Sequence, residues 1–441
     1  MLFKAKVGLI CIGLEGERID YAREFEVQAR EHLKDVEILN EPGVLTNKQD
    51  ITDKVRQLQS MDADAFIFLV GTWILADGVV DTIQKAQGTP VAIWGIPEPV
   101  SFSGVGANVL HGALCEMDIQ HKLFYGTPDD PDTLLEITDY CAACMATMRL
   151  RGARLGLIGG RSISAYPTAA DPNQIKAIFG VEVDHIDQMV VLEKARAIKD
   201  ADALSCFGEI KSKYKSFDAP EDVILKSMKV HMAVQQVIDE YKLDMATIKC
   251  LGDFINTYTS CCMAVTLSND AGRVLSCQCN INATLSMYIM KLLSGNSVTF
   301  GDVSTVDYKT REVRVITCGA MPTNMSQNHK DVSWIQQYEY MGKGRGVCPL
   351  FCMKEGPVTF GYLGRRNGKY EMLIAPATAF EKQVEEIVSV RTWPQGFMHI
   401  DGDPKEFYHN ILSNHTCWGY GDFSQRLLEF CELNQVATVK I

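Results

Sequence analysis

The first third of the chain alternates short apolar runs with stretches of helical periodicity. Apolar runs occur at residues 7–14, 65–71 and 90–95, and the segment 50–60 between two of them has apolar residues at helical spacing. This alternation is typical of a parallel sheet with helices on both faces, because parallel strands need crossover connections. We therefore predict a doubly wound α/β domain over residues 1–150.

A second α/β unit is predicted to begin at the apolar segment 152–160. Apolar runs at 189–192 and 203–207 follow, and then a long amphipathic segment from about residue 220 to 241. We expect this unit, residues 151–245, to be doubly wound as well. Its glycine-rich start is not a G-x-G-x-x-G motif and has no acidic residue placed to read a ribose, so nucleotide binding is unsupported.

The pattern changes beyond residue 245, where strands follow one another through turns rather than helices. Strand-like runs occupy residues 312–319, 357–366 and 369–379, and the dipeptide Asn367-Gly368 stands between the last two. Asn-Gly is typical of a two-residue hairpin turn because it accommodates positive φ. We predict a third, mainly antiparallel β domain over residues 246–441.

Length and composition limit the classes of protein to consider. A chain of 441 residues needs two or three cores. The net charge of −12 and the absence of a basic run disfavour nucleic acid as a partner, and no apolar run is long enough to span a membrane. Fifteen cysteines without a secretory signal predict reduced thiols in a cytoplasmic protein. Cys141 and Cys144 have CxxC spacing, but they lie in a helical stretch and are interpreted as helix packing.

Residues 273–303 carry the most specific pattern, which predicts a strand, a helix and then an aspartate on a tight loop. The segment 276–281 reads Ser-Cys-Gln-Cys-Asn-Ile, and Asp302 follows at some distance. Near the end of the chain, His415 stands between Asn414 and a Gly-Asp dipeptide at 421–422. These segments resemble the C-terminal domains of the L-fucose/L-arabinose isomerase family. In that family a glutamate occupies the place of Gln278, and an aspartate commonly that of Asn280.

The resemblance implies a fold, a site and an assembly. The fold would be two doubly wound α/β domains followed by a mainly antiparallel β domain that carries the site. A divalent cation, Mn²⁺ or a similar ion, would be bound by Gln278, Asp302 and His415, with Asp302 and Gln278 in the catalytic positions. Asn280, Asn414 and Trp73 would contact the sugar. The chain would form a trimer or hexamer in which a neighbour's first domain closes the pocket.

The implied reaction is an aldose to ketose isomerisation, which needs a base and a group that polarises the carbonyl. Gln278 cannot accept a proton, so Asp302 or a substitute carboxylate has to serve, and Asp253 and Glu209 are the nearest substitutes by motif position. Thr317 replaces a family histidine. Three alternatives stay open: Gln278 and Asn280 form a closed polar cluster, the chain binds sugar without turnover, or it is an enzyme with altered chemistry on an acidic sugar, which the reduced negative charge favours.

Overall fold

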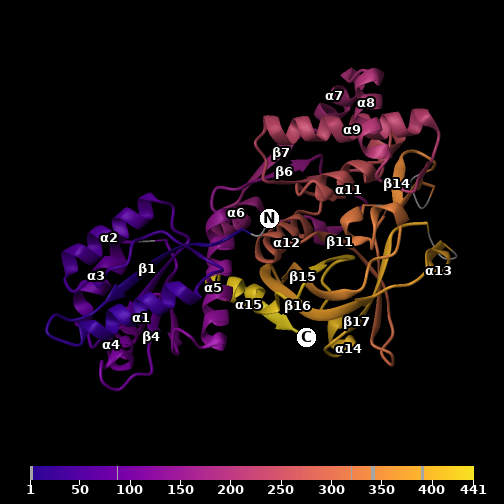
Figure 1. The fold of residues 1–441 in the computed structure, drawn as a ribbon. Helices are drawn as coiled ribbons and strands as arrows, with labels where there is room; N and C mark the ends of the chain where they lie inside the picture. The colour runs from indigo at the N-terminus through magenta and orange to yellow at the C-terminus, as the bar shows by residue number, and fades with distance from the viewer. Residues whose placement is uncertain (1–2, 87, 319, 339–342, 389–391) are drawn as a thin grey trace. The chain divides into compact units, whose positions relative to one another are not determined.

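The computed structural model describes residues 3–86, 88–318, 320–338, 343–388 and 392–441. Its contacts divide the chain into two compact units (Figure 1). The first comprises residues 1–149 with 432–434, and the second comprises residues 150–431 with 435–441. No helix in the described part of the chain is long and apolar enough to cross a membrane.

The first unit is built on a parallel five-stranded sheet in the order β2-β1-β3-β4-β5. Its central strand β3 is buried along its whole length. This confirms the parallel sheet predicted from the alternating apolar runs. Its strands are β1 (Lys6–Ile12), β2 (Glu37–Ile38), β3 (Ala65–Val70), β4 (Val91–Gly95) and β5 (Lys122–Tyr125), and its helices are α1 (Ile19–His32), α2 (Lys48–Ser60), α3 (Ala76–Lys85), α4 (Ser103–Glu116) and α5 (Pro131–Leu150).

The second unit begins with another parallel sheet, in the order β10-β9-β6-β7. The amphipathic segment predicted near 220–241 is the helix α9. The strands are β6 (Arg154–Ile158), β7 (Glu182–Ile186), β9 (Met245–Ile248) and β10 (Val274–Cys277), and the accompanying helices are α6 (Pro172–Phe179), α7 (Gln188–Ala197), α8 (Asp200–Lys211), α9 (Glu221–Glu240), α10 (Asp253–Thr257) and α11 (Cys262–Asp270).

Two apolar runs that a doubly wound unit would use as strands are helical instead. Residues 189–192 lie in α7 and residues 203–207 in α8, where Ala203 is the one buried residue. Short apolar runs do not distinguish a strand from one side of a helix. In α7 the side chain of Asp187 accepts a hydrogen bond from the backbone of Met189, which begins the helix at that point.

A small mixed sheet, in the order β14-β13-β8, joins distant parts of the second unit. It consists of β8 (Ser216–Asp218), β13 (Ser333–Gln336) and β14 (Val347–Leu350). Because β8 pairs in parallel with β13, the segments on either side of the predicted boundary near residue 245 share one sheet. That boundary stays a prediction.

The C-terminal region is a closed, mainly antiparallel β barrel. The order is β15-β18-β11-β12-β17-β16, and β16 pairs back onto β15, while β19 adds to β16 in parallel. Closure leaves no exposed sheet edge among the six ring strands. The elements are β11 (Val298–Val306), β12 (Glu312–Ile316), β15 (Gly356–Arg366), β16 (Lys369–Phe380), β17 (Gln395–Ile400), β18 (His415–Tyr420) and β19 (Ala437–Lys440), with α13 (Val384–Val388), α14 (Pro404–His409) and α15 (Ser424–Leu433).

Two sequence predictions about this barrel have different outcomes. Asn367 and Gly368, with φ of 52° and 79°, form the predicted turn between β15 and β16. Asp302, however, does not lie on a tight loop, because it is inside β11 and pairs with His415 of β18 and Ile316 of β12. Hydrogen bonding on both sides extends β11 through Asp302, and a local pattern does not reveal such long-range pairing.

Helix α12 (Ile281–Ser294) connects the parallel sheet to the barrel (Figure 1). It contacts β9 and β10 of the sheet and β11, β15 and β18 of the barrel. Twelve of its 14 residues are buried, and a helix that is buried on nearly every side has to lie inside the molecule.

All fifteen cysteines, Cys141 and Cys144 of α5 among them, are free thiols.

Gly301 provides a test of the close approach between β11 and its neighbours. A Cβ atom there would lie 2.5 Å from the carbonyl oxygen of Ile316 and 2.8 Å from Cη2 of Trp418. We expect Gly301→Ala to lower the free energy of unfolding by about 1–3 kcal/mol, since buried strands cannot easily separate. Gly208→Ala is the control, because open space surrounds that helical position; it should raise stability by up to about 1 kcal/mol. Urea denaturation measures both, and equal effects would contradict the close approach.

Candidate functional site

Asn280 is the N-cap of α12 and lies fully buried between that helix and β18. Its side-chain Oδ1 accepts a hydrogen bond from the backbone N–H of Ala283 at 2.9 Å. Its Nδ2 lies 2.8 Å from Nδ1 of His415. The cap therefore fixes the orientation of the amide, because only the oxygen can accept from a backbone N–H.

This orientation decides where the proton of His415 lies. Since Nδ2 of Asn280 is a donor, Nδ1 of His415 has to accept, and a neutral imidazole then carries its proton on Nε2. Burial lowers the pKa of His415, and the nearby Asp302 carboxylate raises it to a smaller extent. His415 is accordingly a neutral imidazole that presents an N–H donor on Nε2. The ring of Phe300 packs against it edge to face, with 5.1 Å between ring centroids.

Asp302 lies directly opposite His415 in the antiparallel pairing of β11 and β18. Directly paired residues place their side chains on the same face of a sheet, with Cβ atoms about 5 Å apart. Nδ2 of Asn414 donates to Oδ1 of Asp302 at 3.1 Å. Three of the predicted site residues therefore lie together through strand pairing, and Asn280 joins them from the start of α12.

Gln278 occupies a strained turn between β10 and α12. Its φ is 63° and that of Cys279 is 51°, and each left-handed residue costs about 1–2 kcal/mol. The Cys279 thiol donates to the carbonyl of Ile158 at 3.2 Å, which helps to hold the turn. The side chain of Gln278 is buried, and its Nε2 lies 3.8 Å from Sγ of Cys318.

The carbonyl oxygen of the Gln278 side chain has no hydrogen-bond partner among the described residues. A buried acceptor without a partner costs about 1–3 kcal/mol. The side-chain oxygen of Gln278 is therefore available to accept a hydrogen bond from a ligand hydroxyl group or to coordinate a cation. The closed polar cluster considered as an alternative would leave no such free acceptor.

The hydrogen bonds do not fit the predicted three-ligand manganese site as they stand. The oxygens of Gln278 and Asp302 are suitable donors to a hard cation, but Nε2 of His415 carries the proton. Histidine ligands normally donate their other ring N–H to an acceptor, whereas Asn280 offers a donor. Ligation through Nε2 would require the Asn280 amide to turn over, which would remove the cap from α12. Manganese binding stays a prediction.

The remaining sequence candidates have other surroundings. Asp253 is exposed at the start of α10, where it pairs with Lys249, and Glu209 is exposed on α8. Thr317 is buried, and its hydroxyl accepts from the backbone of Ala320, so it holds a turn. Gly319 of the same loop lies outside the described residues.

Trp73 belongs to the first unit and is half-buried on the loop after β3. Its backbone N–H donates to the carbonyl of Ser101. In the strand order, β1 is followed by β2 on one side and by β3 on the other, so this loop lies at the point where the order of the strands reverses. The crevice at such a point commonly binds ligands. Trp73 as a sugar platform stays a prediction.

Sequence reasoning missed a pocket of about 340 Å³ that Tyr362 and Arg365 of β15 line together with Asn282 of α12. Nε of Arg365 is buried there and has no hydrogen-bond partner in the described part of the chain. The hydroxyl of Tyr362 lies near Ser413 and Asn280, although it makes no hydrogen bond of normal geometry with any of the described residues. The sequence offers no signal for this pocket, because barrel closure alone brings β15 beside α12.

Comparison with known proteins supports the predicted resemblance. Residues 294–441 match the family model described as L-fucose isomerase, C-terminal domain, and the match includes Asp302, Asn414 and His415 but not Gln278 or Asn280. A sulfoquinovose isomerase from Alkalicoccus urumqiensis is 21% identical over 373 residues, which span 82% of this chain and 83% of that protein. A sulfoquinovose isomerase from Priestia aryabhattai is 18% identical over 437 residues and spans 97% of each chain.

Among solved structures, a solute-binding protein of an ABC transporter from Burkholderia multivorans aligns with 62% of this chain and 85% of its own length. The sequence identity is 14% and the TM-score is 0.19, and a similarity this low supports no conclusion.

Replacing Asn280 tests whether its amide stabilises both α12 and β18, through its hydrogen bonds to Ala283 and His415. We expect Asn280→Ala to lower the free energy of unfolding by about 2–4 kcal/mol, of which about 1 is the lost cap and the rest the unpaired Nδ1 of His415. Asn47→Ala is the matched control, because Asn47 caps α2 through the same contact to Asp50 but lies exposed. Chemical denaturation that gave equal losses would contradict the role of His415.

The position of the histidine proton can be tested directly. In the unsubstituted protein, nitrogen NMR of labelled histidine should show His415 with its proton on Nε2. In Asn280→Asp the carboxylate accepts from both Ala283 N–H and the ring, so the proton should move to Nδ1. A proton on Nδ1 before substitution would overturn the assignment.

Proposed function

We propose that this chain, whose residues 294–441 match the family model of the L-fucose isomerase C-terminal domain, is an aldose–ketose isomerase that acts on an acidic sugar derivative. The relatives that share nearly its whole length are isomerases of this kind. The observation that carries the proposal is the cluster of Asp302, His415 and Asn414 across β11 and β18.

The reaction moves a proton between two adjacent carbons and redistributes charge on their oxygens. Asp302 is the base in this proposal: its carboxylate takes the proton from the carbon next to the aldehyde, which leaves an ene-diolate, and returns that proton to the former aldehyde carbon. Over the same two steps the hydroxyl proton of the neighbouring oxygen passes to the former aldehyde oxygen, so a new carbonyl group forms at the neighbouring carbon. Nε2–H of His415 donates to the substrate oxygen on which negative charge develops. Asn414 orients the Asp302 carboxylate through its hydrogen bond.

Gln278 serves as a neutral contact in this proposal. Its free carbonyl oxygen accepts from a substrate hydroxyl group, which relieves the cost of leaving it unpaired. A glutamate at this position would repel a negatively charged sugar, whereas the amide does not. The exchange of carboxylates for amides at 278 and 280 therefore favours an acidic substrate.

The pocket lined by Tyr362 and Arg365 supplies a place for the acidic group. The guanidinium is a planar fork of donors that suits an anion with several oxygens, and its buried Nε has no hydrogen-bond partner among the residues that the structure describes. Tyr362 connects the pocket to the cluster, since its hydroxyl lies near Asn280. Sulfoquinovose, the sugar named for the relatives, carries such a group as a sulfonate.

Three predictions from the sequence belong to the same proposal. The divalent cation expected at Gln278, Asp302 and His415 stays a prediction from the sequence, and no step of the proposed reaction depends on it. Trp73 would stack on the sugar, and the chain would form a trimer or hexamer in the cytoplasm.

Turnover of sulfoquinovose tests the reaction. We expect the purified chain to form the ketose, and we expect Asp302→Asn to lower kcat by about 10²-fold or more, because the amide cannot take a proton. Asp253→Asn is the control and should retain full activity, since that carboxylate is exposed and paired with Lys249.

The same assay separates the alternatives. Activity that survives a strong chelator would contradict the predicted requirement for manganese. Activity that is lost in chelator and restored only by Mn²⁺ would support it. Binding without turnover, seen as ligand-induced thermal stabilisation, would indicate a sugar-binding protein and overturn the proposed reaction.

The acidic group can be tested at Arg365. We expect Arg365→Gln to raise KM for sulfoquinovose by about tenfold or more with a smaller effect on kcat, because the anion contact is lost on binding. Arg366→Gln is the matched control: that side chain is exposed and pairs with Glu371. Equal effects of the two substitutions would contradict the assignment of the pocket.

A further inference from the structure

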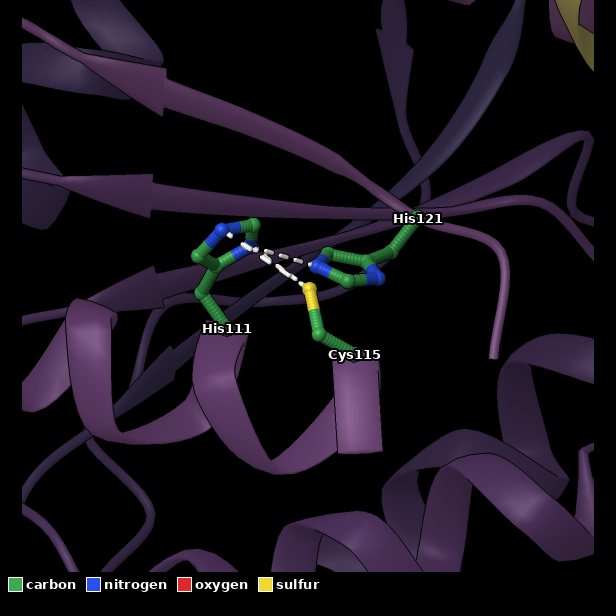
Figure 2. A group of neighbouring side chains, drawn as sticks. All are labelled: His111, Cys115 and His121. Atoms are coloured by element: carbon green, nitrogen blue, oxygen red, sulfur yellow. Dashed lines mark hydrogen bonds between the residues drawn. The ribbon is translucent and has the colours of Figure 1, made fainter. Parts of the chain in front are cut away.

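A second cluster of reactive side chains lies in the first unit, whereas the cluster on the barrel belongs to the second unit. His111 and Cys115 stand one turn apart near the end of α4, and His121 immediately precedes β5. Figure 2 shows the three side chains converging on one point from these two elements. Among the described residues, they form the one group of at least three His, Cys, Asp or Glu side chains whose ligand atoms all lie within 4.8 Å of one another.

The hydrogen bonds of His121 prepare one of its nitrogens for a ligand role. Nδ1 lies 2.7 Å from the carbonyl of Ile119, and a carbonyl can only accept, so the proton of the ring is on Nδ1. Nε2 therefore holds a lone pair that faces the cluster. A histidine that donates one N–H to a backbone carbonyl is the usual arrangement behind a metal ligand.

The separations are close to those of a tetrahedral zinc site. Bond lengths of about 2.0 Å to nitrogen and 2.3 Å to sulfur place two nitrogens about 3.3 Å apart and nitrogen and sulfur about 3.6 Å apart. Here Nδ1 of His111 lies 2.8 Å from Nε2 of His121, and Sγ of Cys115 lies 3.8 Å from Nδ1 of His111. A shift of about half an ångström between the two histidines would accommodate the ion.

The surroundings favour a cation and give it access. His111 and Cys115 lie in the last turns of α4, where the helix dipole has its negative end. Cys115 is exposed, and both histidines are partly exposed, so an ion reaches them from solvent. The loop carrying His121 is held on its far side, because Gln120 donates to the backbone carbonyl of Glu432 and Lys122 pairs with its carboxylate.

We propose that His111, Cys115 and His121 bind a zinc ion, with water in the fourth position. On binding, the Cys115 thiol releases its proton to solvent as the zinc–sulfur bond forms, and the His111 proton moves from Nδ1 to Nε2. The site lies at the amino-terminal ends of the parallel strands, where β5 begins. Trp73 follows the carboxyl end of β3 and therefore lies at the opposite ends of the strands. Zinc here bridges α4 to the loop that precedes β5.

Cobalt titration of the reduced, full-length protein tests the proposal, because Co²⁺ occupies zinc sites and gives a visible spectrum. We expect one equivalent to produce a thiolate-to-cobalt charge-transfer band together with the intense visible bands of tetrahedral Co²⁺, and one equivalent of Zn²⁺ to abolish both. Zinc should also raise the melting temperature, as any ligand of the folded state does.

Substitutions identify the ligands. Cys115→Ser should abolish the charge-transfer band, and His121→Gln should weaken zinc binding by about tenfold or more. Cys206→Ser and His409→Gln replace a cysteine and a histidine outside the cluster and should change neither. Asp302→Asn should also leave the charge-transfer band and the zinc affinity unchanged, so failure of the isomerase proposal would not affect this result. Absence of the band, or its persistence in Cys115→Ser, would overturn the zinc site.

Discussion

One buried amide connects the two halves of the second unit. Asn280 caps α12 with its oxygen and holds His415 with its nitrogen, and α12 in turn contacts both the parallel sheet and the barrel. Both hydrogen bonds are buried, so no water can replace a lost partner. The position of the cluster of Asp302, Asn414 and His415 relative to the strained turn at Gln278 therefore depends on this side chain.

The amide also changes the chemistry and not only the charge of the site. An aspartate in the same place would accept the ring proton of His415 and leave Nε2 free to bind a metal, whereas Asn280 donates and leaves the proton on Nε2. The exchange thus converts a potential metal ligand into a hydrogen-bond donor. A donor beside the Asp302 carboxylate suits proton transfer at a carbonyl compound, and the free oxygen of Gln278 suits a substrate hydroxyl group.

The barrel supplies the frame for these groups. Closure between β15 and β16 brings Tyr362 and Arg365 beside the start of α12, and the pairing of β11 with β18 brings Asp302 opposite His415. The absence of a side chain at Gly301 allows β12 and Trp418 to pack closely against β11. The first unit has its own frame, in which the end of α4 meets the loop before β5 at His111, Cys115 and His121.

The sequence by itself determined the local elements and the kind of chemistry. The periodicity of apolar residues predicted the parallel strands of the first unit and the helix α9, and the turn composition predicted the turn at Asn367 and Gly368. Each of these features depends on residues that are close together in the chain. The tertiary structure alone decided that residues 189–192 and 203–207 are helical and that Asp302 lies within a strand. It also decided the direction of the Asn280 to His415 hydrogen bond and the approach of His121 to α4, since strand register and buried hydrogen bonds depend on residues distant in sequence.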